Sequence, residues 1–138
     1  MPIVVQAMEQ ADYDAWYADR LEQERVRQEL ESTVFTEEQL MAQGEEVYTK
    51  FCASCHQANG KGVPPVFPSL VGSPIIQGDR DEHIRLVLDG VAGTSMQAFG
   101  NQLSKAEVAA VVHYERHSWG NNAGDITQPL DVANAAGQ

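Results

Sequence analysis

Apolar residues recur at helical spacing in three stretches of the chain, and each stretch opens with a polar capping pair. The stretches are residues 36–51, 79–90 and 104–120. The capping pairs are Thr36 with Gln39, Asp79 with Glu82, and Ser104 with Glu107. Gly90 and Gly120 stand where the second and third stretches should stop. The pattern predicts three amphipathic helices that together form one all-α domain over residues 36–121.

The segments outside this domain have a different character. Residues 1–5 predict a short strand, and residues 11–32 predict a helix that is apolar in its first turns and then mostly charged, as in a solvated linker. Residues 57–74 are rich in Gly and Pro and predict an ordered loop. Residues 122–138 have no useful periodicity, so we expect a flexible tail there.

The composition excludes several function classes. The net charge of −11 argues against nucleic-acid binding, because phosphate contacts need Lys and Arg. The longest apolar run near the third helix, residues 108–112, is too short to span a bilayer, so we expect no membrane contact by this chain itself. The N-terminus lacks the layout of a signal peptide.

The two cysteines of the chain lie in the sequence Cys52-Ala53-Ser54-Cys55-His56. This spacing is typical of covalent haem attachment, in which each thiol forms a thioether with one vinyl group and the adjacent His offers a nitrogen to the iron. A zinc site would need a fourth ligand, usually from a second closely spaced pair; His113 and His117 are possible partners, but both lie on a predicted helix that has another explanation. A redox dithiol would need a βαβ context, and a plain disulfide would leave His56 without a role. The motif therefore favours one covalent haem c.

Beyond this motif, the chain resembles class I cytochrome c over residues 36–121. Gly44 and Tyr48 precede Cys52 at intervals of four, and Val111 and Tyr114 match the opposing pair on the last helix of that family. The resemblance implies a class I fold around one haem, with the first and last helices crossing closely at the glycine.

The same resemblance implies the remaining site residues. The segment at residues 67–72 resembles the family's Pro-x-Leu-x-Gly loop, which implies that the Pro68 carbonyl accepts the second ring N–H of His56. Met96 occupies the family's axial position, although Gln97 replaces the proline that commonly follows it. A thioether ligand favours reduced iron and suits electron transfer. We expect Phe67 and Phe99 to line the haem pocket.

The other histidines and methionines receive plainer interpretations. His83 is expected on a helix surface, and His113 and His117 at the surface or partly covered; a bis-His haem is a less favoured alternative. Met41 is expected to face the core.

Both ends of the chain resemble a second family, cytochrome c oxidase subunit II. In those subunits a copper-ligating Met is followed by a Met-Pro-Ile-Val-Val strand and a Tyr-x-x-Trp segment, and "MPIVVQAMEQADYDAW" fits that order. Some bacterial subunits continue into a fused cytochrome c domain closing with Arg-x-Ser-Trp-Gly-Asn, which residues 116–121 match. Residues 1–35 are then a remnant of the copper domain plus an acidic linker. The other copper ligands are missing, so a copper centre is expected only upstream.

These resemblances imply an electron carrier that transforms no substrate by itself. It would accept electrons from a soluble cytochrome or similar donor and pass them to the copper domain of the oxidase, at the periplasmic face of the inner membrane. Two alternatives stay open: a free periplasmic carrier, and a haem enzyme or gas sensor with an open iron site.

Overall fold

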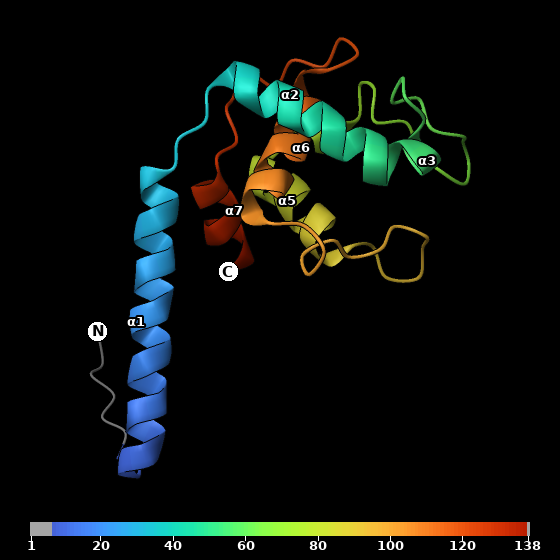
Figure 1. Ribbon diagram of the computed structural model, residues 1–138. Coiled ribbons are helices and arrows are strands. Elements are labelled where there is room, and N and C mark those ends of the chain that lie inside the picture. The colour runs from blue at the N-terminus through green and yellow to red at the C-terminus, as the bar shows by residue number, and fades with distance from the viewer. Residues whose placement is uncertain (1–6, 138) are drawn as a thin grey trace.

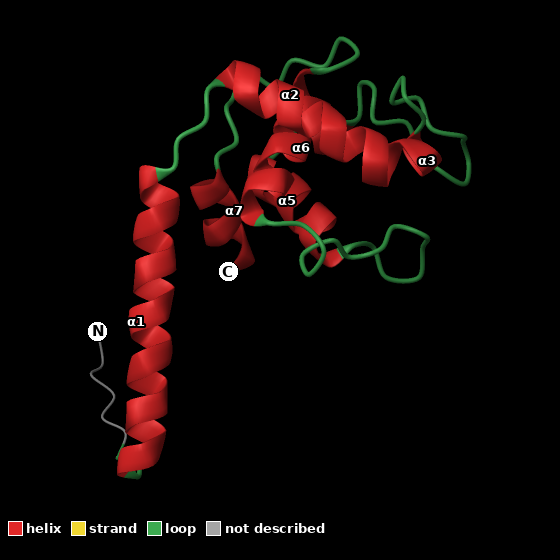
Figure 2. Cartoon of the chain, viewed as in Figure 1, coloured by secondary structure: helices red, strands yellow, loops and turns green. Residues whose placement is uncertain are grey.

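The computed structural model describes residues 7–137, and the chain is helical throughout that range except for loops and one isolated bridge between Val63 and Phe67 (Figure 2). In chain order the helices are α1 (Gln10–Ser32), α2 (Glu37–Val47), the π-helix η1 (Tyr48–Cys52), α3 (Ala53–His56), α4 (Pro74–Gln77), α5 (Arg80–Asp89), α6 (Lys105–His117) and α7 (Pro129–Ala136). The all-α prediction is confirmed. The strand expected at residues 1–5 lies outside the described residues.

The predicted helix starts are confirmed at all three positions. Complete capping boxes open α2 at Thr36 and α6 at Ser104, and the Asp79 side chain accepts a hydrogen bond from the backbone N–H of Glu82 at the start of α5. Each cap satisfies backbone donors that have no partner inside the helix, and so fixes where the helix begins.

The core forms where α2 crosses α6 (Figure 1). Gly44 is buried at this crossing, and a Cβ added there would lie 2.5 Å from Cβ of Tyr114 and 2.9 Å from the carbonyl carbon of Ala110. Only glycine permits the two helices to approach this closely, as the resemblance implied. Around the crossing, Leu40 and Val108 are completely buried.

The C-terminal segment corrects the expectation of a flexible tail. Helix α7 packs against α5 and α6, and its Val132 and Ala135 are buried. The helix is eight residues long, too short to show a clear apolar period, but Pro129 starts it and the Asp131 carboxylate accepts from the Gln128 N–H (2.8 Å). Burial of a small apolar face against α5 and α6 holds it in place.

Helix α1 is a long rod that contacts the domain through α7, while its first turns extend away from the other helices (Figure 1). The segment that follows is tied down: Phe35 N–H donates to Oε1 of Gln128 (3.0 Å), and Nε2 of Gln128 donates to the Phe35 carbonyl (2.9 Å). Tyr13, Trp16 and Tyr17 remain about half exposed. No helix within residues 7–137 has the length and apolar character needed to cross a bilayer.

Candidate functional site

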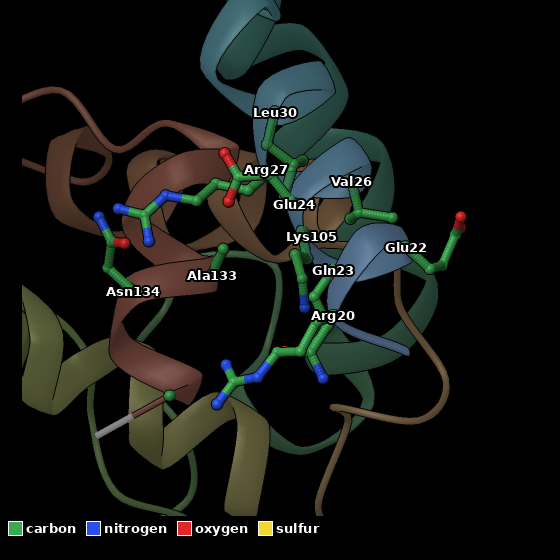
Figure 3. A pocket seen from close by; sticks show the side chains of 11 residues that line it. Arg20, Glu22, Gln23, Glu24, Val26, Arg27, Leu30, Lys105, Ala133 and Asn134 are labelled. Carbon is green, nitrogen blue, oxygen red and sulfur yellow. The ribbon is translucent and has the colours of Figure 1, made fainter. Parts of the chain in front are cut away.

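A cavity of about 490 Å³ opens between η1, α3, α5 and the loops on either side of α5. Its lining is mostly apolar and includes all seven residues expected at the site, from three separate stretches of the chain. They are Cys52, Cys55, His56, Phe67, Pro68, Met96 and Phe99. A second hollow, between α1 and α7, is lined by Arg20, Glu24, Lys105 and a mixture of polar and apolar residues, and holds none of the seven (Figure 3).

The π-helix η1 sets the position of the cysteine pair. Its last residue is Cys52, and the N–H of Ala53 donates to the Tyr48 carbonyl, a wider turn than in an α-helix. Single π-turns often occur at functional sites. Cys52 and Cys55 are free thiols of intermediate exposure on the cavity wall.

The chemistry of Cys52 favours a thiol over a thiolate. Burial, followed by the nearby carboxylate of Glu115, raises the pKa of the Cys52 thiol well above its usual range. A metal–thiolate bond requires the deprotonated form. Among residues 7–137, no cluster of three or more His, Cys, Asp or Glu side chains could hold a metal ion.

His56 is held in one orientation by a backbone carbonyl. Its Nδ1 lies 3.0 Å from the carbonyl oxygen of Pro68, so Nδ1 carries the proton because the carbonyl can only accept. The second nitrogen, Nε2, is then the one with a lone pair for a metal. The hydrogen bond implied by the resemblance is present.

The loop that carries Pro68 is fixed at several points. Gly62 N–H donates to the His56 carbonyl (2.9 Å), and Leu70 N–H donates to the Gly60 carbonyl (2.8 Å). Asn121, beyond the end of α6, accepts from Gly72 N–H (2.8 Å) and donates to the carbonyls of Leu70 and Glu115. The closing Arg-x-Ser-Trp-Gly-Asn sequence thus fastens this loop to α6.

Met96 lies on the loop between α5 and α6, at the cavity wall. Its carbonyl accepts from Val91 N–H (2.9 Å), and its own N–H donates to the Thr94 hydroxyl (3.1 Å). Phe99 N–H donates to the Val87 carbonyl (3.1 Å) and closes the loop against α5. These bonds present a thioether to the cavity without any bond from the Met96 side chain itself.

These residues fit a covalently bound haem. The cavity offers an apolar wall for a porphyrin, two thiols at the attachment spacing, one imidazole with a free nitrogen and one thioether. It also contains a buried polar atom, Nδ1 of His83, that has no hydrogen-bond partner among the described residues.

The structure corrects the expectation that His83 and His113 lie at or near the surface. His83 and His113 have 1% and 0% of their surface exposed. Nε2 of His83 lies 2.9 Å from Oε2 of Glu115, within hydrogen-bond distance, and both residues line the cavity. The expectation failed because the partner of His83 lies 32 positions away on another helix, and no local pattern reveals that pairing.

Arg116 was also missed as a structural residue. It is 2% exposed and donates to Ile76 and Gly78 carbonyls (2.7 and 3.0 Å) and to both carboxylate oxygens of Asp125 (2.7 and 3.0 Å). The arrangement fixes α4 against α6 behind the site.

Comparison with known proteins agrees with this chemistry. Residues 39–114 match the profile of a family described as cytochrome c oxidase, cbb3-type, subunit III. The chain is 35% identical over 94 residues to cytochrome c-552 of Thermus thermophilus, covering 58% of this chain and 70% of that protein.

Two longer relatives are cytochrome c subunits of dehydrogenases. One belongs to the quinone alcohol dehydrogenase of Gluconobacter oxydans, 34% identical over 99 residues, covering 64% of this chain. The other belongs to the gluconate 2-dehydrogenase of Pantoea cypripedii, 34% identical over 122 residues, covering 73% of this chain. The matched part spans only 21% and 28% of the lengths of these two subunits.

Proposed function

We propose that this chain is the domain through which electrons enter a cytochrome c oxidase. The chain belongs to the cytochrome c family matched at residues 39–114, and it carries electrons through a covalent haem c. In this proposal Cys52 and Cys55 would form the two thioethers, and His56 and Met96 would ligate the iron. The observation that carries the proposal is the cavity that brings the cysteine pair and His56 together with Met96 from a separate loop.

The iron of a bound haem supplies the redox chemistry by alternating between ferrous and ferric states. The protein's residues set the conditions for it. The Pro68 carbonyl holds the His56 ring and strengthens its basicity through the hydrogen bond at Nδ1. The Met96 thioether favours the ferrous state. Phe67 and Phe99 exclude water from the cavity wall.

The exposed rim of the cavity supports exchange of electrons with a partner. Val66, Ile75 and Val91 line the cavity and are also 67%, 40% and 39% exposed. Apolar side chains at this rim let a redox partner approach the cavity with little charge to desolvate. We propose this rim as the surface at which electrons pass in and out.

The oxidase assignment is supported by motifs at both ends of the domain. The order of "MPIVV", Tyr13 and Trp16 resembles the end of a subunit II copper domain, and residues 116–121 resemble the close of its fused cytochrome domain. The acceptor would be a copper centre upstream, and the donor a soluble cytochrome. The location would be the periplasmic face of the inner membrane.

A free-standing periplasmic carrier is the second candidate. It is favoured by the relative from Thermus thermophilus, most of whose length this chain covers. A cytochrome subunit of a dehydrogenase would be a third outcome, after the relatives named for such enzymes.

Fractionation of the source cells separates these candidates. An antibody against residues 36–121 is combined with haem staining, and the membrane band is then purified and analysed for copper. A haem-bearing membrane protein well above 15.1 kDa that contains copper supports the oxidase proposal. A soluble haem-bearing band near 15.1 kDa, or a copper-free complex with dehydrogenase activity, refutes it.

A further inference from the structure

His83 and Glu115 form a buried acid–base pair that the electron-transfer site does not otherwise use. Nε2 of His83 and Oε2 of Glu115 are 2.9 Å apart, and the side chains are 1% and 6% exposed. His83 comes from α5 and Glu115 from α6, and both line the cavity that fits the haem. Ionisable side chains are rarely buried unless they are paired.

We propose that the His83–Glu115 pair takes up a proton when the haem iron is reduced, so that electron transfer by this domain is coupled to protonation. The inference rests on the haem occupying this cavity, as in the proposed function, but not on the oxidase as partner. In the coupled step, one electron enters the iron from the redox partner and one proton enters the pair from solvent. Neither bond breakage nor a further reactant is needed, and the net charge of the site is unchanged.

The size of the cavity sets the strength of the coupling. A cavity of about 490 Å³ is, taken as a sphere, about 10 Å across, so the pair on its wall lies within about that distance of a group inside. Two unit charges about 10 Å apart at an effective dielectric constant of about 20 change each other's binding constants roughly tenfold. Reduction removes one positive charge from the iron and so increases the affinity of the pair for a proton by that factor.

The other ionisable groups around the pair are either buried or already paired. Glu115 is faced by Tyr48 of η1 and Tyr114 of α6, and burial raises the pKa of both hydroxyls. Cys52 of η1 also faces Glu115, but as a thioether in the haem-loaded protein it has no proton to exchange. Helix α4 and residues 91–103 carry no titratable side chain. The nearby cations are already paired: Arg116 with Asp125 at 2.7 Å, and Arg80 of α5 with Asp131 of α7 at 2.9 Å.

The second ring nitrogen of His83 is available for a proton or a hydrogen bond. Its Nδ1 is buried with no hydrogen-bond partner among the described residues. Protonation of His83 at this nitrogen would place a hydrogen-bond donor there. An internal polar atom without a partner is otherwise costly to keep.

The test is the midpoint potential of the haem-loaded protein, measured by spectroelectrochemistry from about pH 5 to 8, the range in which histidine pairs change charge. As pH rises over this range, the equilibrium constant for reduction of the wild-type haem is expected to fall about tenfold, which for one electron lowers the midpoint potential by 59 mV. His83→Gln and Glu115→Gln keep the size and hydrogen-bonding capacity of the pair but cannot titrate together, and both should flatten the curve. His113→Gln is the matched control, since His113 is equally buried on α6 but does not line the cavity.

Two results would overturn the inference. One is a wild-type potential that does not change with pH. The other is a curve that survives in both pair variants, which would assign the proton to the haem carboxylates. The visible spectra of both oxidation states are recorded throughout: an abnormal spectrum in the wild type would count against the proposed haem ligation, whereas a normal spectrum with a flat curve refutes only the proton coupling.

Discussion

Substitution of Gly62 by alanine tests whether the backbone around Pro68 controls the histidine ligand. Gly62 has a φ of +61°, a conformation that costs an L-residue about 1–2 kcal/mol. A Cβ at this position would lie 2.5 Å from the Pro68 oxygen and 2.8 Å from its carbonyl carbon. Both are backbone atoms that cannot rotate aside, so overpacking adds about 1–3 kcal/mol. The expected total loss of stability is about 2–5 kcal/mol.

The same displacement should reach the iron. The Pro68 oxygen accepts the hydrogen bond from His56 Nδ1, so moving it weakens the basicity of the ligand and raises the midpoint potential. Gly124→Ala is the matched control, because Gly124 has a φ of +72° and no atom within 4 Å of an added Cβ. It should lose only the conformational cost of about 1–2 kcal/mol and keep its potential.

Urea unfolding of the ferric protein and spectroelectrochemistry give the two quantities. Equal stability losses in Gly62→Ala and Gly124→Ala, with equal potentials, would refute the idea that contact with the Pro68 carbonyl positions His56. A larger loss in Gly62→Ala together with a raised potential would support it.

Three further predictions concern the frame of the domain. Gly44→Ala should lose about 1–3 kcal/mol in urea unfolding despite the better helix propensity of alanine, because its Cβ meets the Ala110 backbone; unchanged or increased stability would contradict the close crossing. Burial, and next the charge of a neighbouring histidine, lowers the pKa of His113. The contribution of the neutral His113 ring to stability is therefore complete above the unfolded pKa of about 6.5 and is lost as pH falls through the folded pKa. His113→Gln should accordingly lose less stability than the wild type when the protein is denatured at decreasing pH. An unchanged pH profile of stability would argue against a buried neutral ring. Arg116→Lys should cost about 1.5–3 kcal/mol, because lysine cannot make the bidentate bond to Asp125 and also reach two carbonyls; a stability equal to that of wild type would show that this network is dispensable.

Local signals in the sequence were sufficient for the helices that carry their own start sites. The pairs at Thr36, Asp79 and Ser104 each satisfy backbone groups within four residues, so the sequence pattern and the structure agree there. The attachment motif at Cys52 was equally local.

What could not be predicted depends on distant partners. The pairing of His83 with Glu115 and the burial of Arg116 join residues more than 30 positions apart. Helix α7 forms because its short apolar face meets α5 and α6, a contact that its own eight residues do not encode. The loop geometry that places Pro68 against His56 came from resemblance to a family, since spacing alone gives no hydrogen bond.

Ligation of the haem iron by Met96 is tested by comparing the NMR spectrum of the ferrous, haem-loaded protein with that of Met96→Ala. We expect one methionine methyl signal shifted far upfield by the porphyrin ring current in the wild type, and its loss in the variant. A wild-type spectrum without such a signal, or one that persists in Met96→Ala, would contradict ligation of the haem iron by Met96 and with it the proposed electron-transfer site.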